Sequence, residues 1–388
     1  MTDIKYSLYR DIFALQGIRN PAVDYNGLEK ARGYIEAVLS ELNIAYTSEP
    51  FYLDGFEQPF YNIDADFGDS SRPVLYIGSH YDTADLSPGA NDNASGTAVM
   101  LMLARLLQSL EHSVHVRLLF FTLEENNPVY ELYKRETERN LNITNSQGFF
   151  TELRYNEDQQ AFKRAMTAAA GNSTSYAQQF ELAYKGIYKN LSPQMRDYYG
   201  SLAQFNRGFS DRMGFGQRAL IGSSRWAESC KPENSDTLGM IDLDCVGYSV
   251  TTPYSQIIPG NVEINESNSY LVDPKRQCGN FIAAIANKGA TRLAQTFLKG
   301  ARDNGLPYYH YDCPHSYETV AGLAPELLLA DHAPFWKREL PCLFVTDTGG
   351  VGRYWFEHTA ADTIDKLNFD FMAQVVLSLY SGIRQLYM

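Results

Sequence analysis

The sequence lacks an excess of basic residues, a long hydrophobic run and any closely paired cysteines, and each absence argues against a class of protein. Across 388 residues, 33 Lys and Arg are outnumbered by 46 Asp and Glu, which gives a formal net charge of -13. Such an acidic chain lacks the basic surface with which proteins bind nucleic acids or anionic membranes. We therefore expect no nucleic-acid partner and no membrane partner.

No segment has the apolar length of a transmembrane helix. The N-terminal sequence MTDIKYSLYRDIF also lacks the basic start and uninterrupted apolar core of a signal peptide. These features predict a cytoplasmic protein, unless a leader has been removed.

The five cysteines are odd in number and never form a Cys-x-x-Cys pair, so we expect reduced thiols, several of them buried. They are Cys230, Cys245, Cys278, Cys313 and Cys342.

The composition is that of a globular chain with a large core, since 44% of the residues are hydrophobic and 13% are aromatic. Wholly apolar runs such as VRLLFF are typical of strands in a parallel sheet covered on both faces. Amphipathic helical patterns alternate with these runs, for example over residues 27–42. The sequence predicts an α/β fold with a mixed, mostly parallel central sheet and helices on both faces, formed as one domain over residues 1–388.

The stretch GSHYDTADLSPGANDNASGTAVMLMLARLL, residues 78–107, carries His80, Asp82 and Asp92 between an apolar run and a helix that begins near Ser95. Imidazole and carboxylate groups are the ligands that zinc takes when thiolates are absent. The glycines and asparagines of PGANDNASG allow a tight loop that could direct Asp92 back toward His80. Taken alone, this pattern also fits a structural or solvated turn.

A second apolar segment, residues 114–127, ends in the adjacent carboxylates Glu124 and Glu125. Because side chains alternate along a strand, the two carboxylates point in different directions. One could bind a metal while the other faces a water molecule. In sheets of this kind, ligands gather at the carboxyl ends of the strands, where His80 and both glutamates fall.

Two downstream segments add another carboxylate and another imidazole: GMIDLDCVGY contains Asp244, and WFEHTAADTIDKL contains His358 ahead of an expected helix. With these segments the chain resembles the co-catalytic dizinc aminopeptidases of clan MH, the group that also holds glutaminyl cyclases and glutamate carboxypeptidases. The pattern is His-x-Asp, a GANDNASG-like loop, Glu-Glu, an Asp before a hydrophobic pair and Gly, and a late His-Thr with Asp-Thr. The resemblance extends from Gly27 to the last helix.

The resemblance implies a zinc-dependent aminopeptidase, a metallopeptidase that hydrolyses the N-terminal residue from a peptide substrate. It also implies two zinc ions, although the same ligand types would accept Mn²⁺ or Co²⁺. The implied roles are a bridging ligand (Asp92), ligands of one ion (His80 and Asp244), ligands of the other ion (Glu125 and His358), a residue that orients His80 (Asp82) and a general base (Glu124).

The chain departs from the family pattern directly after Glu125, where a GLLGS-like segment usually follows. Its equivalent here is ALIGSSRWA, residues 219–227, so residues 126–217 form an insertion much longer than an ordinary connection. The segment 155–205 predicts two or three helices. We expect either a lid over the site or an interface for homo-oligomerisation, with tyrosines on the surface that faces the site or the partner: Tyr176, Tyr184, Tyr188, Tyr198 and Tyr199.

Other interpretations stay open. A glutaminyl cyclase-like zinc acyltransferase forming N-terminal pyroglutamate is the alternative, although Glu357 stands where cyclases generally carry Trp. A non-catalytic protein of this fold would be expected to have lost ligands.

Asp331 and His332 in ADHAPFW are weaker candidates for the site. For HYDCPH, residues 310–315, we expect a structural role or a role in supporting the metal ligands from behind, rather than a separate metal site.

Overall fold

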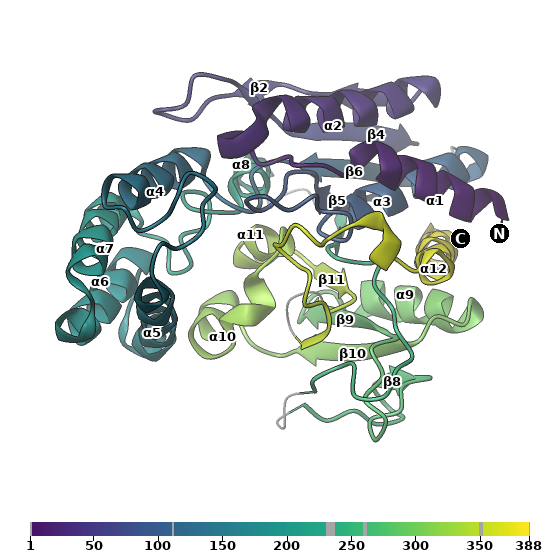
Figure 1. Ribbon diagram of the computed structural model, residues 1–388. Helices are drawn as coiled ribbons and strands as arrows, with labels where there is room; N and C mark the ends of the chain where they lie inside the picture. Colours follow the sequence, from purple (N-terminus) through teal and green to yellow (C-terminus); the bar gives the residue numbers. More distant parts are fainter. Residues whose placement is uncertain (1, 111, 230–236, 259–261, 349–351, 388) are drawn as a thin grey trace.

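The computed structural model describes residues 2–110, 112–229, 237–258, 262–348 and 352–387. Over these residues the chain folds around one mixed sheet with helices on both faces (Figure 1). In their order across the sheet the strands are β1 (Ala45–Thr47), β4 (Ile63–Gly68), β6 (His115–Phe121), β5 (Val74–His80), β7 (Thr237–Leu243), β11 (Cys342–Thr346), β9 (Ile282–Asn287), β10 (Tyr308–Cys313) and β8 (Ser269–Tyr270). A separate hairpin pairs β2 (Pro50–Phe51) with β3 (Phe60–Tyr61).

The four neighbouring strands β6, β5, β7 and β11 are mutually parallel, as are β9 and β10, and the remaining pairs are antiparallel. Their apolar sequences follow from this position, because helices cover both faces of the sheet. His80 at the end of β5 is level with Phe121 at the end of β6. The carboxyl ends of β5, β6 and β7 therefore meet at one edge of the sheet, and the predicted fold class is confirmed.

Two groups of helices cover the sheet. One face carries α1 (Thr2–Leu15), α2 (Pro21–Glu41), α3 (Ala94–Leu107), α9 (Thr291–Asp303) and α12 (Phe369–Tyr387), which bury the largest hydrophobic core against the strands. The other face carries α8 (Ile221–Ser229), α10 (Tyr317–Leu323) and α11 (His332–Lys337). Helix α2 begins six residues before the predicted Gly27 because the Asn20 side chain caps it, accepting the N–H of Ala22 at 2.9 Å. His358 precedes a short 3-10 turn, Ile364–Lys366, and the expected helix follows as α12.

None of the described helices combines the length and the apolar character needed to cross a membrane. Four of the five cysteines are buried free thiols, as expected: Cys245, Cys278, Cys313 and Cys342. Cys230 lies outside the described residues.

The insertion forms a separate group of four helices beside the sheet (Figure 1). They are α4 (Pro128–Asn140), α5 (Leu153–Ala169), α6 (Tyr176–Ile187) and α7 (Pro193–Phe205). The chain leaves and returns at one point, since Asn127 donates its backbone N–H to the Arg218 carbonyl at 2.6 Å. The start of α8 lies beside the Glu pair, because Leu220, the residue before the helix, donates its N–H to the Glu124 carbonyl at 2.8 Å.

The prediction for the insertion's tyrosines is wrong for Tyr198 and Tyr199. Both are buried in the insertion's own hydrophobic core, where Tyr199 stacks on Phe162 with ring centroids 3.9 Å apart. The helices need this core because they lie outside the sheet and cannot bury their apolar faces against it. Tyr184 donates to the Arg196 carbonyl at 2.9 Å within the same group.

The insertion contacts the rest of the chain near the predicted site. Arg135 on α4 pairs with Asp85, which lies in the loop between His80 and Asp92. Lys337 on α11 pairs with Asp211 at the return of the insertion. Whether these contacts make the insertion a lid or an interface stays a prediction.

Because Asn127 and Arg218 are hydrogen-bonded, a short Gly/Ser linker can replace residues 128–217 without separating β6 from α8. We expect the shortened protein to fold and to bind zinc, as measured by circular dichroism and metal analysis. If the insertion is a lid, the ratio of activity on long peptides to activity on dipeptides should rise. An unchanged ratio, together with a change from oligomer to monomer in light scattering, would contradict the lid and support the interface.

Candidate metal centre

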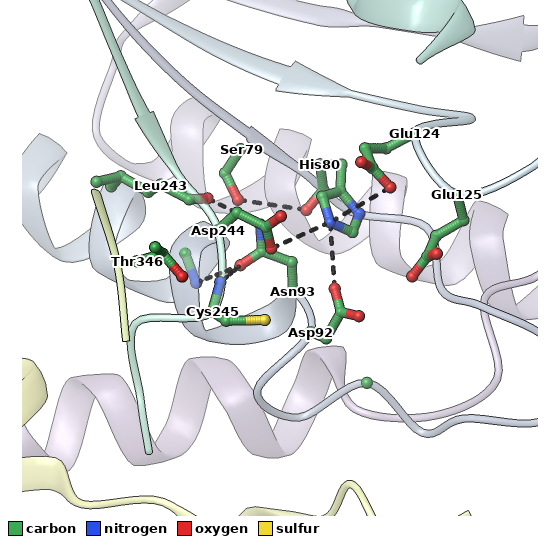
Figure 2. Close-up of polar contacts among 12 residues, drawn as sticks. Ser79, His80, Asp92, Asn93, Glu124, Glu125, Leu243, Asp244, Cys245 and Thr346 are labelled. Carbon is green, nitrogen blue, oxygen red and sulfur yellow. Dashed lines mark hydrogen bonds and ion pairs between the residues drawn. The ribbon is translucent and has the colours of Figure 1, made fainter. Parts of the chain in front are cut away.

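The structure brings the five predicted ligands to one place at the carboxyl edge of the sheet. Figure 2 labels His80, Asp92, Glu125 and Asp244. His80 ends β5, Glu125 follows β6, and Asp244 follows β7. Asp92 precedes α3, and His358 comes from a turn near the C-terminus. Strand β5 lies between β6 and β7, so His80 is at the centre of the group.

Three carboxylates surround the Nε2 atom of His80. Asp92 Oδ1 lies 3.3 Å away and Asp244 Oδ1 lies 3.5 Å away, whereas Glu124 Oε2 is more distant at 3.9 Å. Figure 2 shows these contacts as dashed lines from the imidazole. His80 and Asp92 are therefore close enough to share an ion with Asp244, and Glu124 stands slightly apart.

The second carboxylate oxygen of Asp92 belongs to a different group. Asp92 Oδ2 lies 3.0 Å from His358 Nε2, and Glu125 Oε2 lies 3.2 Å from the same nitrogen. The other Glu125 oxygen accepts the backbone N–H of Ala84 at 3.0 Å, which fixes its orientation. Asp92 thus presents one oxygen to the His80 group and one to the His358 group.

These separations fit metal coordination. Ligand atoms about 2.0 Å from a tetrahedral ion are themselves about 3.3 Å apart, close to the distances between His80, Asp92 and Asp244. Both ring nitrogens of His80 and Oδ1 of Asp244 are buried without a hydrogen-bond partner among the described residues. Buried polar atoms rarely lack a partner, so the donor set fits divalent cations such as zinc.

Electrostatics also indicates a cation site. Burial raises the pKa of Glu124 well above its usual range, and burial together with Asp92 raises the pKa of Glu125 to about 7. Burial alone would lower the pKa of His80, but the carboxylates around it, Glu124 first, raise it well above its usual range. The carboxylates repel one another in a low-dielectric site, and positive charge placed between them relieves that repulsion.

Asp82 is positioned to orient His80 and the Glu pair. Its Oδ1 accepts the backbone N–H of Glu124 at 3.1 Å and its Oδ2 accepts that of Glu125 at 3.2 Å. The same carboxylate lies 3.5 Å from Nδ1 of His80. Asp82 therefore links the end of β5 to the Glu pair, and a carboxylate behind a ligating histidine fixes the orientation of its ring.

Sequence reasoning assigned no role to Asp362, although its Asp-Thr pair was part of the family pattern. Its carboxylate accepts the backbone N–H groups of Asn91 at 2.7 Å and Asp92 at 3.0 Å, and the hydroxyl of Tyr354 at 2.7 Å. Asp362 thereby fixes the peptide that carries the shared ligand.

Arg19 was also missed, because nothing in its local sequence marks it as buried. It is 1% exposed, and its guanidinium donates to carbonyls of the loop after β5, among them Tyr81 at 2.7 Å, Pro88 at 2.8 Å and Gly89 at 2.9 Å. Burial lowers its pKa to about 10. A positive φ of 58° at Gly89 lets the loop turn there, where a Cβ atom would lie 2.3 Å from the Asp92 carbonyl.

The weaker candidates lie behind or outside the ligand group. His332 donates its backbone N–H to Asp242 at 2.8 Å, and its Nδ1 is 3.2 Å from the same carboxylate oxygen. Asp331 is buried, and burial raises the pKa of its carboxyl well above the usual range. In the HYDCPH segment, His310 Nδ1 lies 2.8 Å from the Ala284 carbonyl of β9, which is a structural contact.

A cavity of about 430 Å³ opens beside the ligands. Asp244, Cys245 and Glu357 line it on the side of the metal centre. Its remaining wall is largely apolar and includes Ile257, Ile258, Val262, Ile264, Phe281, Ile285 and Phe344. A cavity of this size with a few polar groups at one end is typical of a ligand site.

The model of peptidase family M28 matches residues 62–217, which contain five of the seven predicted site residues and end at the insertion's return. The predicted resemblance to the dizinc peptidases of clan MH is confirmed. Asp244, which follows β7, and His358, which lies in a turn, are beyond the segment that the M28 model matches.

Similar proteins include enzymes of two kinds. The chain is 25% identical to the uncharacterized protein YfbL of Escherichia coli over 366 residues, 92% of this chain and 79% of YfbL. It is 48% identical to the aminopeptidase YwaD of Bacillus subtilis over 52 residues, 13% of this chain and 11% of YwaD. A glutaminyl cyclase structure from Bacteroides thetaiotaomicron shares the fold with a TM-score of 0.53 at 13% identity, covering 98% of this chain and 96% of the cyclase.

Replacing Arg19 by Met should loosen the loop after β5, because the carbonyls of Tyr81, Pro88 and Gly89 would lose a buried donor. Each buried group left unpaired costs about 1–3 kcal/mol, so we expect a loss of about 3 kcal/mol or more in the free energy of unfolding. Zinc affinity, measured by competition with a chelator, should fall as well. The exposed Lys30→Met on α2 is the control, and equal stability of the two variants would contradict this role of Arg19.

Proposed function

We propose that this protein is a zinc-dependent aminopeptidase that hydrolyses the N-terminal residue from peptides. The observation that carries the proposal is the division of Asp92 between two ligand groups, with Oδ1 3.3 Å from His80 and Oδ2 3.0 Å from His358. A carboxylate placed in this way can bridge two ions. The M28 match over residues 62–217 and the identity to an aminopeptidase over 52 residues support the class of reaction.

In this proposal the two ions have separate ligands around the shared carboxylate of Asp92. His80 and Asp244 would hold one ion, and Glu125 and His358 would hold the other. Two divalent ions, when bound, would polarise the scissile carbonyl and lower the pKa of a water molecule beside it. Asp82 would hold His80 and the Glu pair in place through the contacts described above.

Glu124 would act as the general base. Its carboxylate lies 3.9 Å from His80 Nε2, farther than the oxygens of Asp92 and Asp244, and so it is the group left to accept a proton. Burial raises the pKa of Glu124, which brings it nearer the range that suits proton transfer at neutral pH. Glu124 would take a proton from the attacking water and pass it to the leaving amine.

The proposal includes features that the ligand types alone leave open. We assign two zinc ions rather than one because the two groups around Asp92 are distinct. A cytoplasmic location and a homo-oligomer formed through the insertion belong to the same proposal, and neither enters the chemistry of the site.

Glu124→Gln and Glu125→Gln should separate the two carboxylate roles. An amide at position 124 cannot accept a proton, so the turnover of leucine p-nitroanilide should fall by about 10²–10⁴-fold while the zinc content stays near two ions per chain. Glu125→Gln removes a ligand and should lower the zinc content by about one ion. Equal zinc loss in both variants, measured by atomic emission, would show that the roles are assigned wrongly.

A glutaminyl cyclase-like acyltransferase is the second candidate. The observation that favours it is Asp331, a buried carboxyl without a hydrogen-bond partner among the described residues, whose charge also raises the pKa of Glu124. Such a group near the base could assist a reaction in which the substrate's own amine attacks. The shared fold with a solved cyclase is compatible with either enzyme.

A panel of aminoacyl anilides and N-terminal glutaminyl peptides separates the two candidates. For the aminopeptidase we expect free amino acids as products from several anilides. For the cyclase we expect pyroglutamyl peptides, identified by a mass loss of one ammonia, and no cleavage of the anilides. Pyroglutamate as the sole product would overturn the aminopeptidase.

A further inference from the structure

We infer that Glu357 binds the α-ammonium group of the substrate and that the apolar cavity beside it takes the side chain of the first residue. This inference rests on the proposed function and deepens it, because it names the group that restricts the site to free N-termini. Glu357 directly precedes His358, and its side chain lines the cavity together with Asp244. It therefore stands at the border between the ligands and the apolar wall.

The side chain of Glu357 is placed to take a cation. It is 21% exposed, and its Oε2 atom is buried without a hydrogen-bond partner among the described residues. The charges that act on it most strongly are the negative charges of Asp92, Asp244 and Glu125 and the positive charge of His358, so the negative charges outnumber the positive one. A carboxylate in such surroundings is stabilised by a neighbouring positive charge, which the ammonium group of a peptide supplies.

Glu357 lies close enough to Asp92 and His358 to be a possible metal ligand, but it is the most distant of the three carboxylates around His358. Its Oε1 lies 3.9 Å from His358 Nε2, whereas Glu125 and Asp92 place oxygens at 3.2 Å and 3.0 Å from that nitrogen. Ligands of one tetrahedral ion are about 3.3 Å apart, so the His358 group already has two carboxylates at coordinating distance without it. Glu357 is left to face the cavity.

The rest of the cavity is consistent with a first residue that carries an apolar side chain. Phe281 directly precedes β9, Ile285 lies within β9, and Phe344 comes from β11, so the apolar wall is built on the sheet itself. A peptide with its ammonium at Glu357 and its side chain against this wall would place its first carbonyl toward the ligand group. An acylated N-terminus would lack the charge and would leave the buried Oε2 atom of Glu357 without a partner, which disfavours binding.

The test measures binding without turnover. The probe is 3-methylbutylamine, which combines an apolar side chain with an ammonium group, and 3-methylbutan-1-ol is the uncharged analogue. Calorimetry with zinc-loaded protein should give amine binding that Glu357→Gln weakens about tenfold, the usual effect of losing a charge-assisted hydrogen bond. Alcohol binding and zinc content should stay unchanged. Glu326→Gln, which removes an exposed carboxylate elsewhere on the cavity wall, is the matched control.

Three outcomes would overturn the inference. Unchanged amine affinity in Glu357→Gln would show that the carboxylate does not bind the ammonium. Loss of one zinc ion would make Glu357 a metal ligand. An equal loss of affinity in Glu326→Gln would indicate attraction by the general charge of the cavity. A different result would contradict the proposed function and leave this inference intact. In that case the wild-type protein would bind the amine through Glu357 but would not hydrolyse leucine p-nitroanilide.

Discussion

Repulsion among buried carboxylates is the constraint on which this structure depends. Asp92, Glu124, Glu125 and Asp244 meet within a few ångströms of His80, in a region largely closed to water. Such an arrangement is stable only when the carboxylates take up protons or share cations. The surrounding fold holds these groups together through donors supplied by the backbone. Asp82 and Asp362 each accept two backbone N–H groups of the ligand loops, and Arg19 donates to the carbonyls of one of those loops.

The sheet order turns distant sequence positions into neighbours. Strand β5 lies between β6 and β7, so residues 80, 125 and 244 meet although long segments separate them in the chain. The parallel direction of these strands matters as much as their order, because only parallel neighbours end at the same edge. The apolar cavity continues from this edge along β11 and β9, where the direction of pairing reverses.

Much of the fold and the ligand group could be predicted from the sequence, because strand ends and a Gly/Asn-rich loop leave clear local patterns. His80, Asp92 and the Glu pair follow apolar runs whose length and composition indicate buried strands. Other features depend on tertiary contacts that leave no such pattern. Arg19 belongs to a residue type that is usually exposed, so its burial could not be inferred. Tyr198 and Tyr199 could have lined a surface or filled a core, and the packing of four helices decided between these alternatives.

The hydrogen bonds that join Asn127 to Gln217 and Arg218 close the insertion at its base. Closing such a long segment costs conformational entropy, and the segment's own packing and the hydrogen bonds at its base offset this cost. The distance between β6 and α8 therefore does not depend on the length of the segment. The two ends of the insertion are therefore joined at one point of the chain, next to Glu124 and Glu125. A change in the length of the helices beyond that point would leave the position of the Glu pair as it is.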